Sequence, residues 1–109
     1  MACRADMMRP DAPLLQGQSA FYMLHPSLAG RVDFPDMAGL AANRPLFLRS
    51  GHGDRHMPVD SVQRAFGRLA KLAKGTDGSV VDAAFHDAGH TMPAEVTQAA
   101  LRFLMHHLR

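Results

Sequence analysis

One local pattern, present twice, constrains the fold of this sequence more than any other feature: a short apolar run, a loop, a proline and an amphipathic helix. The first apolar run spans residues 44–48, and the helical pattern that begins at Pro58 continues to about Lys74. The second run spans residues 80–85, and Pro93 opens the final helix. Short apolar runs bounded by turn residues indicate buried strands, and proline favours the first turn of a helix. Each half of the pattern therefore predicts a strand followed by a helix.

Both expected long helices carry apolar residues at intervals of three and four, which places these residues on one face. In the first helix this face comprises Val59, Val62, Phe66, Leu69 and Ala73. In the last helix it comprises Val96, Ala100, Phe103, Leu104 and Leu108. A shorter helical turn is predicted at residues 36–42, following Pro35. Each long helix thus has one face suited to packing on a sheet.

The order strand, helix, strand predicts an α/β fold. Two strands of one sheet that are joined by a helical crossover run parallel, and the crossover is right-handed in nearly all cases. We therefore expect two parallel strands with a right-handed βαβ crossover and a C-terminal helix. Open α/β sheets place ligands and reacting groups at the carboxyl ends of their strands. Asp54 follows the first strand and His90 follows the second, so these two side chains are expected to lie side by side.

Length and composition limit the classes of function. The 109 residues allow one compact domain, and no apolar run reaches the length of a membrane span, so no membrane role is expected. The single cysteine permits neither a disulfide framework nor a thiolate zinc site, which is compatible with a cytoplasmic location. Residues 1–15 are expected to be a loose N-terminal leader without a signal-peptide core, and residues 16–109 the folded segment.

The charge pattern gives little support for a nucleic-acid partner. The net charge is only +2. Four cations line one face of the first expected helix: Arg64, Arg68, Lys71 and Lys74. Such a face is typical of a solvated helix side with cations near its C-terminus. We therefore expect no nucleic-acid binding.

Asp54 and His90 have the chemistry of a catalytic acid and base. A carboxylate that binds one imidazole nitrogen fixes the tautomer, leaves the other nitrogen free to take a proton and stabilises the resulting imidazolium. Asp54 suits the orienting role and His90 the role of general base. In the alternative interpretation, Asp54 bonds the backbone of its own loop and His90 is an ordinary loop residue.

The segment 44–59, the Ala88-Gly89-His90 loop and the amphipathic terminal helix together resemble the C-terminal third of an α/β-hydrolase. The closest likeness is to the dienelactone hydrolase and acetyl-xylan esterase group, whose members also carry a segment similar to residues 34–43 just before this strand. The resemblance spans about residues 21–109. It implies a partial α/β-hydrolase fold in which Asp54 and His90 are the acid and base of a serine carboxylic-ester hydrolase. The implied substrate is a small-molecule ester, and no cofactor is expected.

The nucleophile elbow and the oxyanion hole of that family are missing from the sequence. Family members carry a Gly-x-Ser-x-Gly nucleophile elbow on an earlier strand, with an oxyanion hole of neighbouring amides, and neither is found here. The nearest string surrounds Ser19 but lacks the second glycine and does not follow a strand-like run, so Ser19 is not expected to be the nucleophile. Without a nucleophile the acid and base have little to activate. We therefore expect the isolated chain to lack significant esterase activity.

Three interpretations of the function stay open. In the first, the chain is the C-terminal catalytic segment of a serine ester hydrolase and is completed by an N-terminal portion. In the second, it is a non-catalytic module that keeps hydrolase-like βα units for binding a partner. In the third, it belongs to a peptidase of the prolyl-oligopeptidase type, which shares the same terminal pattern. Because two parallel strands leave both outer edges unpaired, strands from a partner, from a second copy or from an N-terminal portion are expected.

A metal site is the rival chemistry, because the chain has seven histidines. They include two pairs at four-residue spacing, namely His52 with His56 and His86 with His90. This spacing brings imidazoles to one side only on a helix, and both pairs fall in loops or at strand ends. No His-Glu-x-x-His string is present. The spacing therefore predicts no metal site.

Overall fold

A computed structural model of the chain describes residues 26–28 and 30–108. The elements in chain order are η2 (Pro26–Leu28), α3 (Phe34–Gly39), β1 (Leu46–Gly51), α4 (Val59–Ala73), β2 (Val81–His86) and α5 (Ala94–His107). The predicted leader at 1–15, together with Ser19, lies outside the described residues. No helix in the described ranges is long and apolar enough to cross a membrane.

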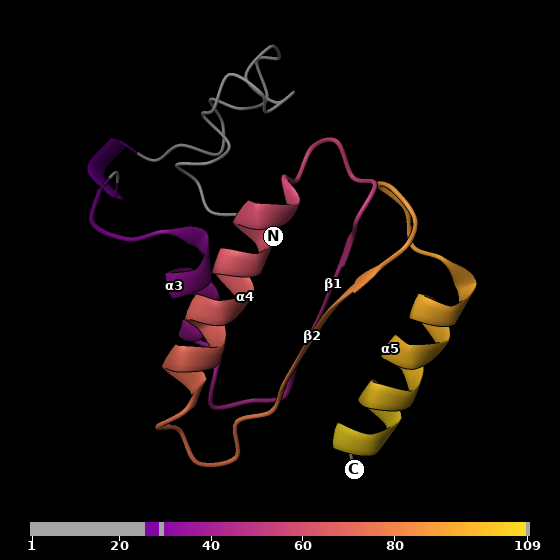
Figure 1. Ribbon diagram of the computed structural model, residues 1–109. Helices are drawn as coiled ribbons and strands as arrows, with labels where there is room; N and C mark the ends of the chain where they lie inside the picture. The colour runs from indigo at the N-terminus through magenta and orange to yellow at the C-terminus, as the bar shows by residue number, and fades with distance from the viewer. Residues whose placement is uncertain (1–25, 29, 109) are drawn as a thin grey trace.

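The two strands form a parallel sheet, and α4 connects them along the chain. The register pairs Leu46 with Val81 at one end and Gly51 with His86 at the other. Figure 1 shows α3 and α4 on one side of the strands and α5 on the other, with the loops that follow β1 and β2 at the same edge. The predicted mixed α/β architecture and the parallel direction of the strands are confirmed.

The first strand lies further along the chain than residues 44–48, which the apolar run predicted. The amide of Arg44 donates to the carbonyl of Ala41 at 3.0 Å, so this residue belongs to a turn. The ladder begins where the Leu46 amide donates to Val80, at 2.7 Å, and it continues beyond the last apolar residue to His52, whose amide donates to His86 at 2.9 Å. Pairing of the backbone, rather than the extent of the apolar run, therefore sets the length of β1.

The core of the structure lies on the inner face of α4. Val62 and Leu69 of this helix are fully buried, and so is Ala65 between them. Val62 also packs against aromatic and apolar side chains from three other segments, namely Phe34, Met57 and Phe85, and against Phe66 of its own helix. The apolar face predicted for the first helix is thus the face that α4 presents to the sheet and to α3.

Helix α3 begins at Phe34, two residues before the predicted helical turn. A capping box explains this start: the side chain of Asp33 accepts from the backbone amide of Asp36, and the side chain of Asp36 accepts from the Asp33 amide at 2.9 Å. The Asp33 side chain also accepts from the Phe34 amide at 2.6 Å. Asp36 also binds Arg68 of α4 through two hydrogen bonds of 2.6 and 2.8 Å. Arg68 therefore joins α3 to α4 and is not a purely solvated cation of the kind the charge pattern indicated.

Helix α5 is covered over only part of the apolar face that its sequence predicted. Val96 is 6% exposed, and the ring of Phe103 lies 5.4 Å from that of Phe47 in β1. Leu104 and Leu108, which belong to the same predicted apolar face, are however 48% and 78% exposed. A sheet of two strands offers a narrow surface, which covers one side of the helix and leaves the side that carries Leu104 and Leu108 open to solvent.

Gly67 is an exposed position in α4 where an alanine is expected to stabilise the protein. A Cβ at Gly67 would meet no atom within 4 Å, and glycine costs about 0.5–1 kcal/mol relative to alanine inside a helix. We therefore expect Gly67→Ala to raise the free energy of unfolding by about that amount, measured by urea denaturation. As a contrast, Gly78→Ala should lower it, because Gly78 has a φ of 75° that L side chains rarely adopt.

Candidate active site at the carboxyl edge of the sheet

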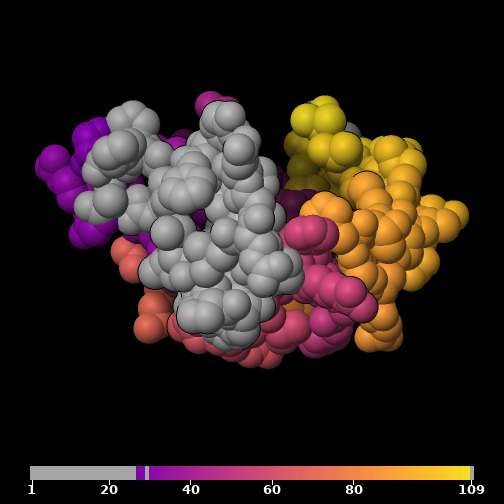
Figure 2. Space-filling view, turned by 90° about the horizontal axis from the view of Figure 1, so that it is seen from above, coloured from indigo at the N-terminus to yellow at the C-terminus, as the bar shows by residue number. Residues whose placement is uncertain are grey.

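Two loops form the candidate site, and their backbones lie directly against each other. The β1–α4 loop contributes the amide of Gly53, which donates to the carbonyl of Ala88 in the β2–α5 loop at 3.1 Å. Gly51 is buried against the carbonyls of Ala88 and Gly89, where a Cβ would come closer than 3.0 Å to both oxygens. Figure 2 looks down on this edge and shows atoms of the two loops, in magenta and orange, side by side. Glycine at position 51 thus lets the loops meet.

The contact between the loops brings Asp54 and His90 together. Nδ1 of His90 lies 2.9 Å from Oδ2 of Asp54, although the two residues are 36 positions apart in the chain. The Asp54 side chain is 7% exposed and the His90 side chain is 67% exposed. The carboxylate is therefore held inside the loop, and the imidazole projects from it toward solvent. The predicted contact between Asp54 and His90, which follows from the parallel direction of the strands, is confirmed. The catalytic roles of the two residues stay a prediction.

The position of the Asp54 carboxylate is determined by its own loop. The backbone amide of His56 donates to Oδ1 of Asp54 at 2.8 Å, and the amide of Asp54 donates to the carbonyl of Gly51 at 3.2 Å. With Oδ1 engaged by the loop, Oδ2 faces His90. The alternative interpretation, in which Asp54 bonds its own backbone, is thus correct as well, because one oxygen serves the loop and the other serves the imidazole.

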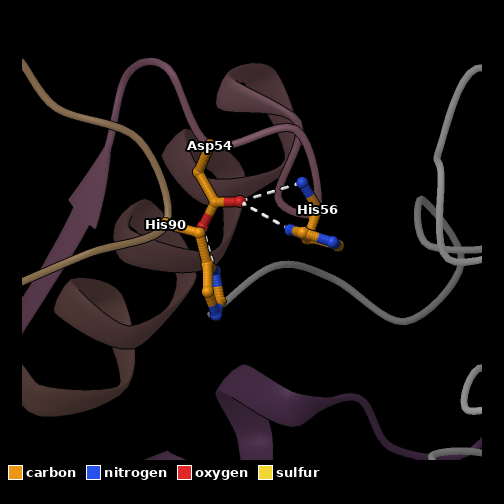
Figure 3. Close-up of side chains that lie close together, drawn as sticks. All are labelled: Asp54, His56 and His90. Atoms are coloured by element: carbon orange, nitrogen blue, oxygen red, sulfur yellow. Dashed lines mark hydrogen bonds and ion pairs between the residues drawn. The ribbon is translucent and has the colours of Figure 1, made fainter.

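His56 is the member of the cluster that the sequence reasoning missed. Its Nδ1 lies 3.4 Å from Oδ1 of Asp54, and its ring centroid lies 5.0 Å from that of His90. Figure 3 shows the Asp54 carboxylate between the two imidazoles. The available signal was the Asp-x-His spacing, because an aspartate that accepts from the amide two residues later turns the chain back on itself.

The Asp54 carboxyl is more acidic than an ordinary aspartate. Burial alone would raise its pKa, but the hydrogen bond with His90, the backbone amide of His56 and the charges of both imidazoles favour the ionised form. The net result is a pKa below 3.8. The carboxylate is therefore ionised at neutral pH, as its proposed role of orienting an imidazole requires.

The lowered pKa of Asp54 predicts how stability depends on pH. A carboxyl whose pKa is lower in the folded state contributes stability above its unfolded pKa, and this contribution is lost as the pH falls through the folded pKa. We expect the difference in unfolding free energy between the wild-type protein and Asp54→Asn to be larger at about pH 5, where the Asp54 carboxyl is ionised, than at pH values below 3.8. Urea denaturation at a series of pH values from about 5 downward measures it, and a difference that grows over this range would contradict the prediction.

A pocket of about 260 Å³ lies beside the Asp54 and His90 pair. Its other walls include Ser50 at the end of β1, Met57, His86 and Thr91. Pockets for small molecules commonly measure about 300–1,000 Å³, so this one suits a small group. Since Nδ1 of His90 faces Asp54, its Nε2 is the nitrogen left to exchange a proton with a bound molecule.

The two histidine pairs at four-residue spacing do not form clusters of their own. The ring of His52 stacks on Phe85 with centroids 4.5 Å apart, and Nδ1 of His86 accepts from the Ala88 amide at 3.2 Å. One member of each pair joins Asp54 instead: Asp54, His56 and His90 form a group of metal-ligating side chains.

A nucleophile is the component of a triad that remains unassigned. Ser50 and Thr91 place hydroxyl-bearing residues on the pocket wall, but neither belongs to a Gly-x-Ser-x-Gly string. In the part of the chain that the structure describes, the site therefore holds Asp54 and His90 with no serine assigned as a nucleophile. Comparison of the chain with protein-family models, curated proteins and solved structures finds no match.

Proposed function

We propose that this chain supplies the acid and base of a serine carboxylic-ester hydrolase of the α/β-hydrolase type. The observation that carries the proposal is the 2.9 Å contact between Nδ1 of His90 and Oδ2 of Asp54. The contact lies at the carboxyl edge of two parallel strands, where α/β enzymes place their reacting groups. It has the orientation that a Ser-His-Asp triad requires, with the carboxylate on Nδ1 and Nε2 available.

In the proposed mechanism, His90 first takes up a proton and later releases it, while Asp54 holds the imidazole in the required orientation. The Asp54 carboxylate holds the His90 tautomer that has its proton on Nδ1, so that Nε2 takes the proton of an attacking hydroxyl. The imidazolium that forms is stabilised by the carboxylate 2.9 Å away. His90 then gives the proton to the departing alkoxide, and in the second half of the reaction it activates water in the same way.

The nucleophile of the proposed enzyme comes from outside the residues described here. In the described part of the chain the sheet consists of β1 and β2 alone, and both of its outer edges are unpaired. Parallel sheets are normally larger and covered by helices on both faces, so further strands added at an edge would extend this sheet. A serine carried on such a strand of the same polypeptide would complete the triad.

The size of the pocket favours a short acyl group. A volume of about 260 Å³ lies just below the usual range of about 300–1,000 Å³ for small-molecule sites, and polar or charged residues such as Arg49, His86 and Thr91 line most of its wall. Acetyl esters and small lactones fit this description. The proposed substrate is therefore a small carboxylic ester or lactone.

Labelling with a fluorophosphonate tests the proposal, because this reagent modifies serines that are activated by a neighbouring base. The longest polypeptide encoded around this chain should be labelled, and the 109-residue chain alone should not. Labelling that is absent from the longest polypeptide would contradict the proposal.

A second candidate function, binding a protein partner without catalysis, is favoured by the exposed side of α5. Four large apolar side chains there are about half or more exposed: Leu101, Leu104, Met105 and Leu108. Apolar residues grouped on one helix face are typical of an interaction surface. Absence of labelling from the longest polypeptide would favour this candidate over the hydrolase.

A further inference from the structure

The cluster around Asp54 has a second chemical capacity, which does not depend on the hydrolase proposal. One ligand atom from each of Asp54, His56 and His90 lies within 4.8 Å of the other two. The carboxylate oxygens lie 2.9 Å from Nδ1 of His90 and 3.4 Å from Nδ1 of His56. Two imidazoles and one carboxylate are a common set of protein ligands for a metal ion with one open position.

The spacing of the three groups fits a tetrahedral ion. Bonds of about 2.0–2.2 Å to nitrogen and oxygen place neighbouring ligand atoms about 3.4 Å apart in a tetrahedron. Two separations lie close to this value: 2.9 Å from Oδ2 of Asp54 to Nδ1 of His90, and 3.4 Å from Oδ1 of Asp54 to Nδ1 of His56. Because these values belong to different carboxylate oxygens, an ion held by one oxygen requires one imidazole to rotate toward that oxygen. The remaining pair, His56 and His90, has to close by no more than about 1.4 Å from its limit of 4.8 Å.

The three side chains differ in their exposure to solvent in a way that suits metal binding. Asp54 is 7% exposed, and the His56 amide holds its carboxylate in place. The imidazoles of His56 and His90 are 48% and 67% exposed, so both can rotate toward an ion without disturbing the core. An ion that reaches the carboxylate from solvent therefore meets both imidazoles.

We propose that Asp54, His56 and His90 form a binding site for a divalent transition-metal ion of the Zn²⁺ type. Two imidazole nitrogens and one carboxylate oxygen favour Zn²⁺, Co²⁺ or Ni²⁺ over Mg²⁺ and Ca²⁺, which prefer oxygen ligands. Coordination through a ring nitrogen leaves the imidazole proton on the other nitrogen of the ring. Solvent occupies the fourth position, because the two imidazoles lie at the surface. The metal uses the same carboxylate and imidazole as the proposed acid and base, so a bound ion would block their proton transfer.

Calorimetric titration of the metal-free 109-residue chain with ZnCl₂ tests the site. We expect one ion per chain, with no corresponding binding of Mg²⁺. His56→Ala removes one ligand and keeps the backbone amide that holds Asp54. Loss of a residue that only supports a ligand already costs about 10- to 100-fold in metal affinity, so His56→Ala should weaken Zn²⁺ binding at least about tenfold.

His106→Ala is the matched control, because His106 is an exposed histidine of α5 outside the cluster. It should bind Zn²⁺ with wild-type affinity. Equal weakening in both variants, or unchanged binding in His56→Ala, would show scattered surface binding and overturn the proposal, as would the absence of binding. Circular dichroism verifies that each variant is folded, and His56→Phe provides a second removal of the ligand.

The calorimetric result and the labelling result are independent. Absence of Zn²⁺ binding would overturn the metal site and leave the hydrolase proposal intact, because labelling needs no metal. Absence of labelling with retained Zn²⁺ binding would overturn the hydrolase and support the metal site. The two proposals thus fail separately.

Discussion

Replacing His90 with alanine is expected to abolish fluorophosphonate labelling of the longest polypeptide that contains this chain. His90 is the proposed base, and its Nε2 is the nitrogen left free by the contact with Asp54. Loss of the base of a triad costs about 10⁴-fold or more in rate, because the serine is no longer deprotonated as it attacks. The rate of labelling, measured by gel fluorescence against time, should therefore fall below detection.

Asp54→Asn tests the same pair by changing the carboxylate instead of the imidazole. The amide keeps the size of the carboxylate but supports the wrong imidazole tautomer, and the expected loss of rate is about 10⁴-fold. His106→Ala, at the far end of α5, is the control and should be labelled at the wild-type rate. Wild-type labelling of His90→Ala in a folded protein would exclude His90 as the base.

Gly51→Ala is expected to have the largest effect on the architecture of the site. A Cβ at position 51 would meet the backbone carbonyls of Ala88 and Gly89 inside 3.0 Å. Backbone atoms cannot rotate away, so the β1–α4 and β2–α5 loops would have to separate. Forced overpacking of this kind costs about 1–3 kcal/mol, and we expect the upper part of that range in the free energy of unfolding, measured by urea denaturation.

Separation of the loops should also break the contact between Asp54 and His90. In the wild-type protein, the ¹⁵N chemical shifts of the His90 ring should show the proton on Nδ1, because this nitrogen faces the carboxylate. In Gly51→Ala the ring should show the mixture of tautomers that a free imidazole has. The two measurements together distinguish loss of stability from loss of the pair.

Gly53→Ala provides the matched control, since it adds the same methyl group two residues away in the same loop. Its Cβ would lie 3.5 Å from the Ala88 carbonyl oxygen, which is an ordinary van der Waals distance. We expect a change of less than about 0.5 kcal/mol and an unchanged His90 tautomer. Equal destabilisation by the two substitutions would mean that close approach at Gly51 is not what joins the loops.

Much of the fold follows from local patterns in the chain. The 3.6-residue spacing of apolar residues located α4 and α5, and Pro58 and Pro93 marked where these helices begin. The order strand, helix, strand predicted the parallel pairing, and hence the meeting of Asp54 with His90. These features could be predicted because each depends on residues that are close together in the chain, or on the one topology that a helical crossover allows.

The remaining features depended on backbone hydrogen bonds and on the width of the sheet, which the apolar periodicity used for the prediction does not describe. The capping box at Asp33 moved the start of α3, and backbone pairing with β2 moved β1 toward Gly51. The exposure of Leu108 follows from the width of the sheet, which the periodicity of a helix does not contain.

The sequence by itself determined two βα units and the meeting of Asp54 with His90 at a common sheet edge, because helix periodicity, proline positions and parallel connection are local or topological properties. Only the tertiary structure decided that Gly51 brings the two loops into backbone contact and that His56 joins Asp54 and His90. The physical reason is that a loop's path is set by its hydrogen bonds, here those accepted by the Asp54 carboxylate and the Ala88 carbonyl. The partners in such bonds become known only when the chain has folded.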